Sequence, residues 1–355
     1  MKIKKLAALC LAAACSMTVL AGCASKDTTP DEPKYQIGEV TINEGEDFET
    51  EKPEPIEGPV KVALIKGPTA LGASEFLHEN DHGTVYGDFE FQLYSSPDEV
   101  TGKIINGEIH AAAVPTNVAS VLYNKTEGEI VVAAINTFGT LFIVENGNSV
   151  SSFEDLAGKE IVSAGQGAVP EYVLQYILNK SGVEDVTVNF VSNHNEAATA
   201  LAAGEADVAL LPEPFVSVAT SKNANLNIAL SIAEEWDEYS YKESGVPNTL
   251  PMGCIVVRKD YLETNERMFK EFLNEYEFFV DKSVEDIALT AEYAAEYEIV
   301  ASAAIAEKAI PNCGIAYVDD AKMMRLMDNF LNIMNEANPK SIGGKVPDED
   351  FYYIR

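Results

Sequence analysis

Short apolar runs alternate with amphipathic stretches along most of this chain, and one segment of the pattern occurs twice. Residues 88–121 align without gaps over residues 185–218, at an offset of 97, and nine of the 34 positions are identical. Each copy predicts a strand, a polar turn, a helix ending at Gly-Glu, a second apolar strand and a proline that begins another helix. The repeat therefore predicts two related halves in which strands and helices alternate.

A glycine-rich turn extends the repeat upstream of each copy. When the alignment is shifted by one residue, Val62–Ala73 corresponds to Glu160–Glu171. The turn at Gly67 then has a counterpart at Gly165 and Gly167. A period near 97 is too long for a solenoid. It is typical of two lobes in which parallel strands are joined by right-handed crossovers. We therefore predict an α/β fold of two lobes, each a mixed, largely parallel sheet flanked by helices.

Four loops join a predicted strand to the helix that follows it. Ligands of open α/β sheets bind beyond the carboxyl ends of the strands, which is where these loops lie. With the two lobes facing each other, the loops line a single cleft: Gly67-Pro68-Thr69, Pro115-Thr116-Asn117, Gly165-Gln166-Gly167 and Pro212-Glu213-Pro214.

The amino-terminal region predicts export rather than a membrane span. Three lysines within the first five residues precede the apolar run Leu6–Leu20, which is too short to span a bilayer. The run ends in Leu20-Ala-Gly-Cys23, which resembles a bacterial lipobox and implies cleavage before Cys23 and lipid attachment to it. Residues 24–59 are rich in Pro, Thr, Asp, Glu and Lys, so we expect a flexible acidic tether.

Charge and cysteine content narrow the classes of partner. Losing the three leader lysines takes the formal charge from −32 to −35, which makes nucleic acid an improbable partner. Two of the five cysteines leave with the leader, which leaves Cys254 and Cys313 besides Cys23. Both lie in apolar surroundings, and we favour two buried thiols over a disulfide.

Several short motifs carry a family resemblance in their order and spacing: Ile65–Gly72, Ala113–Ala119, Leu156–Lys159 with Gly165–Gly167, Leu211–Phe215 and Leu250–Lys259. The run from Val60 to Tyr353 resembles the solute-binding lipoproteins of ABC importers, specifically the nitrate/taurine/sulfonate and thiamine-precursor group. The resemblance implies a type II periplasmic-binding fold that closes around its ligand by hinge motion. It also implies a lipid-anchored monomer outside the cytoplasm that serves a permease and its ATPase.

This resemblance gives the expected organisation. The chain should cross between lobes near Thr140–Gly147 and near Pro251–Arg258, and its last hundred residues should return to the first lobe as helices with buried aromatic and methionine stripes. The predicted division is a leader at 1–22, a tether at 23–59, the first lobe at 60–143 plus 252–355, and the second lobe at 144–251.

The loops predict the kind of ligand. Neutral hydrogen-bonding groups dominate the four loops. Glu213 is the one acid in these loops, and none of the chain's four arginines lies in them. That argues against a sulfonate or nitrate held by a guanidinium group and favours a flat, nitrogen-containing heterocycle such as an aminopyrimidine vitamin precursor. Phe138, Phe215 and Trp236 are candidates for an aromatic wall. The predicted ligand-binding residues are Gly67, Pro68, Thr69, Thr116, Asn117, Thr137, Gln166, Gly167, Glu213 and Trp236.

Catalytic and metal-binding alternatives have weaker support. The Gly165-Gln166-Gly167 turn lacks the third glycine of a dinucleotide fingerprint and the Gly-Lys-Ser/Thr of a phosphate loop. His78 and His82 have the i, i+4 spacing of zinc ligands, with His110 as a third candidate, but solvated histidines explain them better. We expect no catalytic residue, cofactor or metal. The alternatives left open are an enzyme on the same fold, as in menaquinone or pyrimidine biosynthesis, and a ligand-sensing module.

Overall fold

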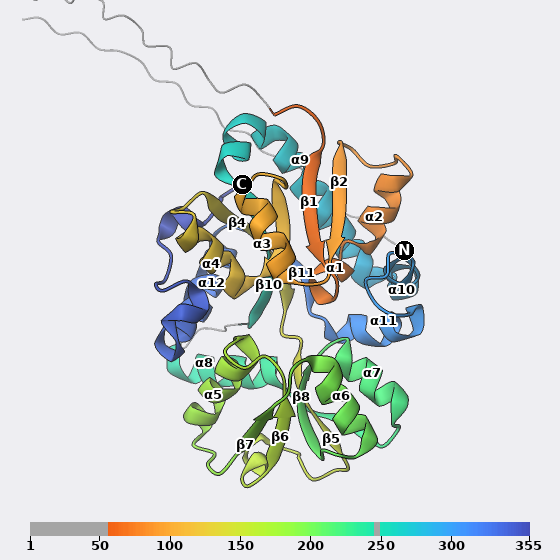
Figure 1. The fold of residues 1–355 in the computed structure, drawn as a ribbon, viewed down its shortest axis with the longest axis vertical. Coiled ribbons are helices and arrows are strands. Elements are labelled where there is room, and N and C mark those ends of the chain that lie inside the picture. Colours follow the sequence, from red (N-terminus) through yellow and green to blue (C-terminus); the bar gives the residue numbers. More distant parts are fainter. Residues whose placement is uncertain (1–55, 245–248) are drawn as a thin grey trace, which may run out of the picture. The chain divides into compact units, whose positions relative to one another are not determined.

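A computed structural model describes residues 56–244 and 249–355, which form two mixed sheets flanked by helices (Figure 1). The predicted leader and Cys23 lie outside the described residues, as does all but the end of the predicted tether. The α/β fold with two mixed sheets agrees with the prediction. Parallel pairing joins β1 to β2 and β3 in the first sheet and β6 to β7 and β8 in the second, and the other pairs are antiparallel.

The first sheet has the strand order β11-β4-β10-β3-β1-β2. Its strands are β1 (Val60–Ile65), β2 (Phe89–Tyr94), β3 (Ala111–Pro115), β4 (Ile130–Phe138), β10 (Pro251–Arg258) and β11 (Ile315–Val318). The surrounding helices are α1 (Pro68–Leu71), α2 (Ser74–Asp81), α3 (Pro97–Ile105), α4 (Thr116–Lys125), α9 (Lys259–Glu285), α10 (Ile287–Glu296), α11 (Ala303–Ala309) and α12 (Asp320–Ala337). Figure 1 shows α3 in front of this sheet and α9 behind it, so both faces are covered.

The second sheet has the strand order β7-β6-β8-β5-β9. Its strands are β5 (Leu141–Asn146), β6 (Glu160–Ser163), β7 (Thr187–Phe190), β8 (Val208–Pro212) and β9 (Leu226–Ser231). Its helices are α5 (Val169–Ser181), α6 (His194–Ala203), α7 (Phe215–Lys222) and α8 (Ile232–Ser244). Short 3₁₀ helices complete the described chain: η1 (Phe153–Leu156), η2 (Ile310–Asn312), η3 (Pro339–Ile342) and η4 (Glu349–Phe351).

The chain passes between the sheets at two neighbouring points. It leaves the first sheet after β4 and enters the second at β5, and it returns before β10. The Gly139 N–H donates a hydrogen bond to the Leu250 carbonyl (2.9 Å), which ties the two crossing segments together. The predicted boundary after residue 143 falls inside β5, and the pairing of β5 with β8 and β9 assigns the whole strand to the second sheet.

Alternate side chains of β5, in the second sheet, pack into two different apolar cores. Phe142 and Val144 of β5 face a cluster formed with α6 and α7, whereas Leu141 and Ile143 face the larger core. Strands buried on both faces appear in sequence as continuous apolar runs, as here. The larger core extends from the first sheet to α5 and α8, so one apolar core joins the two lobes.

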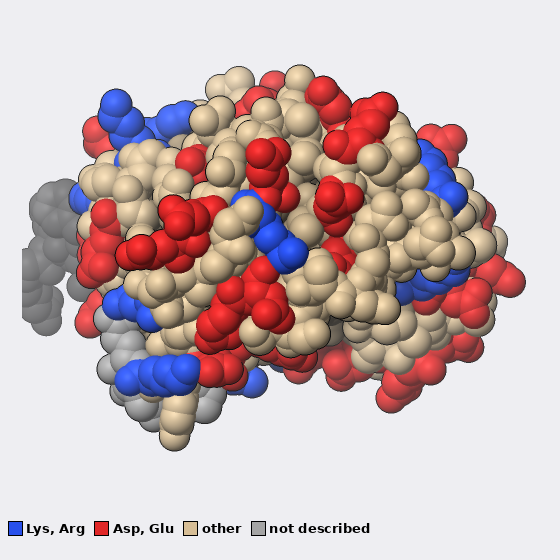
Figure 2. Space-filling model, turned by 90° about the horizontal axis from the view of Figure 1, so that it is seen from below, with Lys and Arg blue, Asp and Glu red and all other residues tan. Residues whose placement is uncertain are grey.

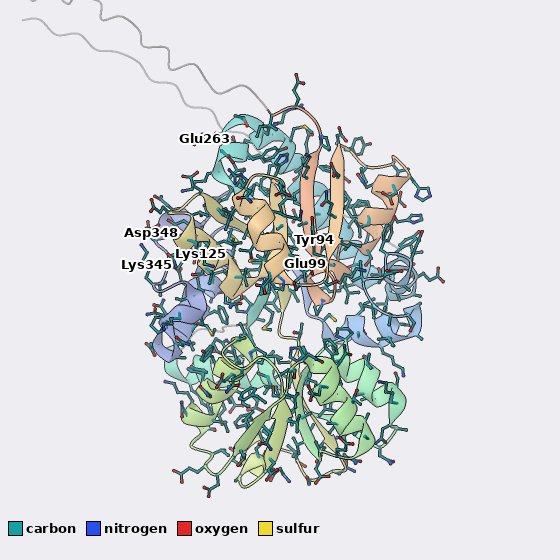
Figure 3. The ribbon with its side chains drawn as sticks, in the orientation of Figure 1. Tyr94, Glu99, Lys125, Glu263, Lys345 and Asp348 are labelled. Atoms are coloured by element: carbon teal, nitrogen blue, oxygen red, sulfur yellow. The ribbon has the colours of Figure 1, made fainter. Side chains whose placement is uncertain are left out.

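The carboxyl-terminal segment returns to the first lobe, as expected. α9 and α12 pack on the first sheet, and the stretch after α12 passes along α4. There the Asn124 side chain donates to the carbonyls of Ile342 (2.9 Å) and Lys345 (2.8 Å). Figure 3 shows Lys125, Lys345 and Asp348 grouped beside α4. Cys254 and Cys313 are buried free thiols, in agreement with the prediction.

His110, just before β3, is a buried histidine that makes folding stability depend on pH. Its ring stacks on Tyr261 (centroids 4.2 Å apart), and its Nδ1 accepts a hydrogen bond from the Lys61 N–H (3.2 Å). Burial, with a smaller effect from the Lys61 charge, lowers the His110 pKa from 6.5 to about 4. Between these two pKa values the unfolded chain binds a proton that the folded chain does not. Stability therefore decreases as the pH decreases through this window.

We expect His110→Gln to flatten the pH dependence of stability between pH 6.5 and 4. Wild type should lose up to about 3 kcal/mol more than the variant over that range, because glutamine does not titrate. Urea unfolding at a series of pH values measures the difference. His82→Gln is the control, since His82 is exposed. Parallel curves for wild type and His110→Gln would contradict this account.

Candidate functional site

A cavity of about 420 Å³ lies where the carboxyl ends of the parallel strands of both sheets meet. Its size is within the usual range for small-molecule sites. The first lobe contributes Pro68, Thr69, Pro97, Pro115, Asn117, Val118, Thr137 and Met252. The second lobe and the crossing segment contribute Thr140, Leu141, Gly165, Ala168, Val169, Pro170, His194, Pro212, Glu213 and Phe215.

Six strand-to-helix connections reach this cavity, two more than the sequence predicted. The additional residues are Pro97, which begins α3, and His194, which begins α6. β2 runs parallel to β1, and β7 runs parallel to β6, so their carboxyl ends lie at the same edges as the predicted loops. The offset of 97 pairs Pro97 with His194, which is the sequence signal that could have identified both.

The structure brings five of the ten predicted binding residues to the cavity: Pro68, Thr69, Asn117, Thr137 and Glu213. Gly67 and Thr116 are neighbours of lining residues without lining it themselves. The buried Thr116 hydroxyl donates to the Pro251 carbonyl (2.9 Å) and so joins the start of α4 to β10. This residue therefore fixes the position of Asn117 rather than contacting the cavity.

Gln166 and Gly167 are not among the residues that line the cavity. Both are exposed, and the Gly167 N–H donates to the carboxylate of Glu171, in the first turn of α5 (2.5 Å). We expected this N–H to be available to a ligand, but the Glu171 side chain already occupies it. Gly165, with φ of 84°, is the glycine of this loop that lines the cavity.

Trp236 lies in the core rather than at the cavity. It is fully buried in α8, and its ring packs between Tyr176 of α5 (centroids 5.0 Å apart) and Phe330 of α12 (6.1 Å). Of the three candidates for an aromatic wall, Phe215 lines the cavity, beside His194, whereas Phe138 and Trp236 are not among the lining residues. Trp236 was a candidate for this wall, but α8 follows β9, which is antiparallel to β5, and α8 packs on the joined core.

Glu213 is a buried carboxylate that connects the two lobes. It is 1% exposed, so it is not a solvated helix-start residue. Its oxygens accept hydrogen bonds from the Ser217 N–H (3.0 Å), the Ser217 hydroxyl (3.1 Å) and the Asn312 amide (3.3 Å). Asn312 belongs to η2, in the segment that follows α11, so this last bond joins the second lobe to the first. Burial raises the pKa of the Glu213 carboxyl, against the effect of these bonds.

The hydrogen-bond donors at the cavity are largely engaged by protein acceptors. The Thr69 hydroxyl donates to the Ile65 carbonyl (2.9 Å) and the Thr137 hydroxyl to the Asn136 side-chain oxygen (3.2 Å). The Asn117 amide donates to the Ser341 carbonyl (3.2 Å). Hydroxyl oxygens that donate retain lone pairs, so these threonines still present acceptors to a ligand.

Proline dominates the apolar part of the lining. Five prolines line the cavity, and three of them, at the starts of α1, α3 and α5, lack the N–H that an anion would use there. The five prolines are Pro68, Pro97, Pro115, Pro170 and Pro212. At these three helix starts a proline ring therefore replaces one of the backbone donors that a phosphate-binding helix would present.

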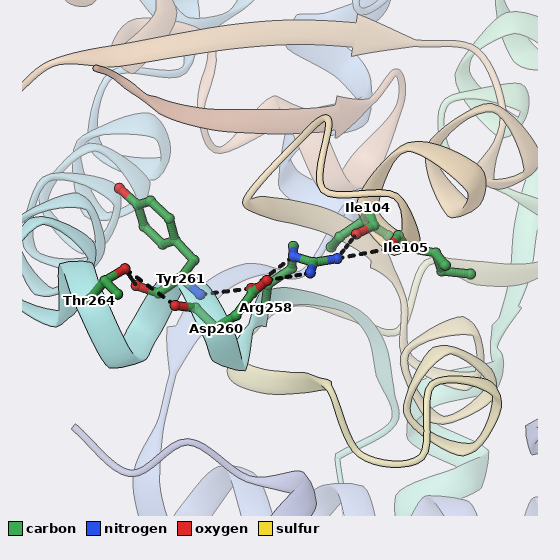
Figure 4. Close-up of polar contacts among 6 residues, drawn as sticks. All are labelled: Ile104, Ile105, Arg258, Asp260, Tyr261 and Thr264. Atoms are coloured by element: carbon green, nitrogen blue, oxygen red, sulfur yellow. Dashed lines mark hydrogen bonds and ion pairs between the residues drawn. The ribbon is translucent and has the colours of Figure 1, made fainter. Parts of the chain in front are cut away.

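Cationic side chains are absent from the described lining of the cavity. Figure 4 shows the use of one arginine elsewhere: Arg258 donates to the carbonyls of Ile104 and Ile105 (2.8 Å each) at the end of α3 and pairs with Asp260. Charged side chains are instead spread over the outer face seen in Figure 2. The cavity contrasts with that surface because Glu213 is its one charged lining residue within the described chain.

The described residues form neither a cluster of metal-ligating side chains nor a membrane-spanning helix. Within residues 56–244 and 249–355, no three histidine, cysteine, aspartate or glutamate side chains cluster as metal ligands would. The His78 ring stacks between His82 (centroids 4.2 Å apart) and Tyr293 (4.0 Å). Every described helix is too short or too polar to span a bilayer.

Comparison with protein families gives one match. A sequence profile described as "ABC transporter, phosphonate, periplasmic substrate-binding protein" matches residues 84–266, about half of the chain. A search of curated proteins found no match.

Solved structures share the fold. An ABC transporter protein from Parabacteroides distasonis superposes with a TM-score of 0.72 at 22% identity, covering 84% of this chain and 99% of that one. The periplasmic aliphatic sulphonate binding protein of Escherichia coli gives 0.64 at 13% identity, with 84% and 92% covered. The periplasmic nitrate-binding protein of Synechocystis gives 0.52 at 13% identity, with 76% of each chain covered.

Proposed function

This chain belongs to the phosphonate family of periplasmic substrate-binding proteins of ABC transporters, and from that premise we propose that it binds an uncharged, nitrogen-containing heterocycle between its lobes. As the substrate-binding component of an importer, it needs a site that closes around a small solute and then opens at the permease. The cavity at the crossing segments has the position that such hinge motion requires.

The observation that carries this proposal is a buried carboxylate in a cavity whose described lining has no Lys or Arg. A phosphonate, sulfonate or nitrate would add negative charge beside Glu213 with no cation to offset it. A carboxylate offers about four lone-pair sites, and three are used by Ser217 and Asn312. The remaining site favours an N–H donor on the ligand.

The rest of the lining agrees with a flat ligand that donates hydrogen bonds. Thr69 and Thr137 present acceptor oxygens, and the five prolines and Phe215 present apolar surface for the faces of a ring. An aminopyrimidine combines an exocyclic amino donor with such a ring. We therefore propose an aminopyrimidine-like vitamin precursor as the imported solute, although related family members are named for phosphonate and structural neighbours for sulphonate and nitrate.

Calorimetric titration of the purified protein tests the ligand class. We expect 4-amino-2-methylpyrimidine to bind, and methylphosphonate, taurine and nitrate to give no heat of binding under the same conditions. Native mass spectrometry of protein purified without denaturation adds an unbiased measurement, because tightly held metabolites survive purification. Binding of methylphosphonate in preference to the pyrimidine would contradict the proposed ligand class but not the transport role.

Glu213→Gln is expected to weaken binding of the pyrimidine by about 1 to 3 kcal/mol. The amide has one acceptor oxygen, so it keeps one of the two bonds from Ser217, and it loses the charge that attracts an N–H donor. Calorimetry measures the change. Glu171→Gln is the matched control, because Glu171 lies in the first turn of α5 and is not among the lining residues. Equal affinities for wild type and Glu213→Gln would leave Glu213 as a structural residue.

We also propose that Cys23 carries the lipid that holds the protein at the extracytoplasmic face of the membrane. The support is the order of charged, apolar and small residues before Cys23 and the acidic stretch that follows. Metabolic labelling with a fatty acid should mark the wild type and not Cys23→Ala, and the variant should appear in the soluble fraction. A labelled Cys23→Ala protein would contradict this proposal.

A further inference from the structure

Thr140 lines the cavity at the point where the chain first crosses between the sheets. The residue is 3% exposed, and its hydroxyl makes no hydrogen bond to any described residue. The hydroxyl oxygen is nevertheless not among the atoms that are both unpaired and fully buried, so it keeps some open surface. Because the cavity is the open space that Thr140 lines, the hydroxyl is available to a solute bound there.

The other hydroxyls of the described lining already donate to protein acceptors. The Thr69 hydroxyl donates to the Ile65 carbonyl (2.9 Å), and the Thr137 hydroxyl donates to the Asn136 side-chain oxygen (3.2 Å). Within the part of the chain that the structure describes, Thr140 therefore has the one lining hydroxyl whose hydrogen atom is not used by the protein. That hydrogen atom can be donated to an acceptor on a solute.

Thr140 and Glu213 are neighbours across two antiparallel strands. The register of β5 with β8 pairs Leu141 with Pro212, and a hydrogen bond from the Glu213 N–H to the Thr140 carbonyl (2.9 Å) continues the pairing by one residue. Residues paired in this way have Cβ atoms about 4.5 to 5.5 Å apart and lie on the same face. Both residues line the cavity, so a hydroxyl donor lies beside a carboxylate acceptor.

The Glu213 carboxylate has acceptor capacity left beside this donor. Its Oε1 accepts hydrogen bonds from the Ser217 hydroxyl (3.1 Å) and the Asn312 amide (3.3 Å). Its Oε2 accepts one bond from within the described chain, from the Ser217 N–H (3.0 Å). A carboxylate oxygen has two lone pairs, so Oε2 can accept a second hydrogen bond. Thr140 and Glu213 together therefore offer one donor and one acceptor side by side.

We propose that Thr140 and Glu213 recognise an amidine edge of the solute, in which an amino group and a ring nitrogen are bonded to the same carbon atom. The Thr140 hydroxyl donates to the ring nitrogen, and the amino group donates to the Glu213 carboxylate. The inference rests on the proposed function and makes Thr140 a residue that determines specificity. It selects 4-amino-2-methylpyrimidine over a ring that has the amino group without the neighbouring nitrogen, such as 3-methylaniline.

Two substitutions at Thr140 and one elsewhere separate this role from packing. Thr140→Val replaces the hydroxyl by a methyl group of similar size, and Thr140→Ser keeps a hydroxyl. Thr290→Val is the matched control, because the Thr290 hydroxyl in α10 is also unpaired within the described chain but is fully buried and away from the lining residues. Neither valine removes a protein hydrogen bond, so both variants should unfold at or above the wild-type temperature. Thermal unfolding checks that each variant folds.

Calorimetric titration with 4-amino-2-methylpyrimidine should show affinity about 5- to 30-fold weaker for Thr140→Val than for wild type, because the ring nitrogen loses its donor. Thr140→Ser should stay within about threefold of wild type, and Thr290→Val should match wild type. 3-Methylaniline should bind wild type and Thr140→Val with equal affinity, since it has no ring nitrogen to accept the bond.

Two results would overturn the role of Thr140 while leaving the proposed function intact. One is wild-type affinity of Thr140→Val for the pyrimidine, and the other is an equal loss of affinity for 3-methylaniline. Absence of pyrimidine binding to wild type would instead overturn the ligand class, and this inference with it.

Discussion

Trp236→Ala is expected to destabilise the protein by about 3 to 5 kcal/mol. The indole is fully buried and packs on Tyr176 and Phe330, at the place where α8 of the second lobe meets α12 of the first. Removing it leaves a cavity at the junction of the two lobes, where neighbouring helices cannot collapse without moving the sheets. Urea unfolding followed by circular dichroism measures the loss.

Two further variants make this test specific. Tyr241→Ala, also in α8 but 53% exposed, should change stability by less than about 0.5 kcal/mol. Trp236→Phe should cost much less than alanine, since it keeps an aromatic ring and removes an indole N–H that has no partner among the described residues. A Trp236→Ala protein as stable as Tyr241→Ala would show that the junction is not tightly packed.

Gly139→Ala is the second substitution with a large expected effect, about 1 to 3 kcal/mol of destabilisation. Gly139 lies where the chain first crosses between the sheets. A Cβ atom there would lie 2.1 Å from the Cβ of Ala233 in α8, so the crossing segment must shift. Because this segment sets how the lobes face each other, we expect weaker ligand binding as well. Unfolding and calorimetry measure the two effects.

A double-mutant cycle identifies the cause of that loss. Ala233→Gly removes the atom that would clash, so the double variant should recover at least about 1 kcal/mol relative to the sum of the single variants. Gly102→Ala is the control: it lies in α3 with no atom within 4 Å of the added Cβ and should stabilise the protein by up to about 1 kcal/mol. Strict additivity in the cycle would exclude the Ala233 contact as the cause.

Much of the fold could be predicted because the repeat records it in local patterns. The paired Gly67 and Gly165 turns and the paired Pro115 and Pro212 positions mark where strands give way to helices, and the structure places these turns at one cavity. The position of β5 was harder to predict. A strand buried on both faces is apolar throughout, and such a run does not reveal which sheet it joins.

The site was predicted less completely, since neighbouring side chains decide which groups are available. Glu171 takes the Gly167 N–H, and Thr116 turns its hydroxyl onto Pro251. Neither of these hydrogen bonds can be predicted from the sequence pattern. His194 was missed because a histidine after a polar turn resembles an ordinary helix start. Its place in the cavity lining follows from the parallel pairing of β7 with β6, which that local pattern does not show.

The placement of Trp236 has one more consequence. The chain contains a single tryptophan, so its fluorescence arises from one site, the contact between α8 and α12. The hinge motion proposed above would change the surroundings of that indole, since its neighbours Tyr176 and Phe330 come from different lobes. Trp236, which is not among the lining residues of the cavity, would thus report the proposed motion optically without any attached label.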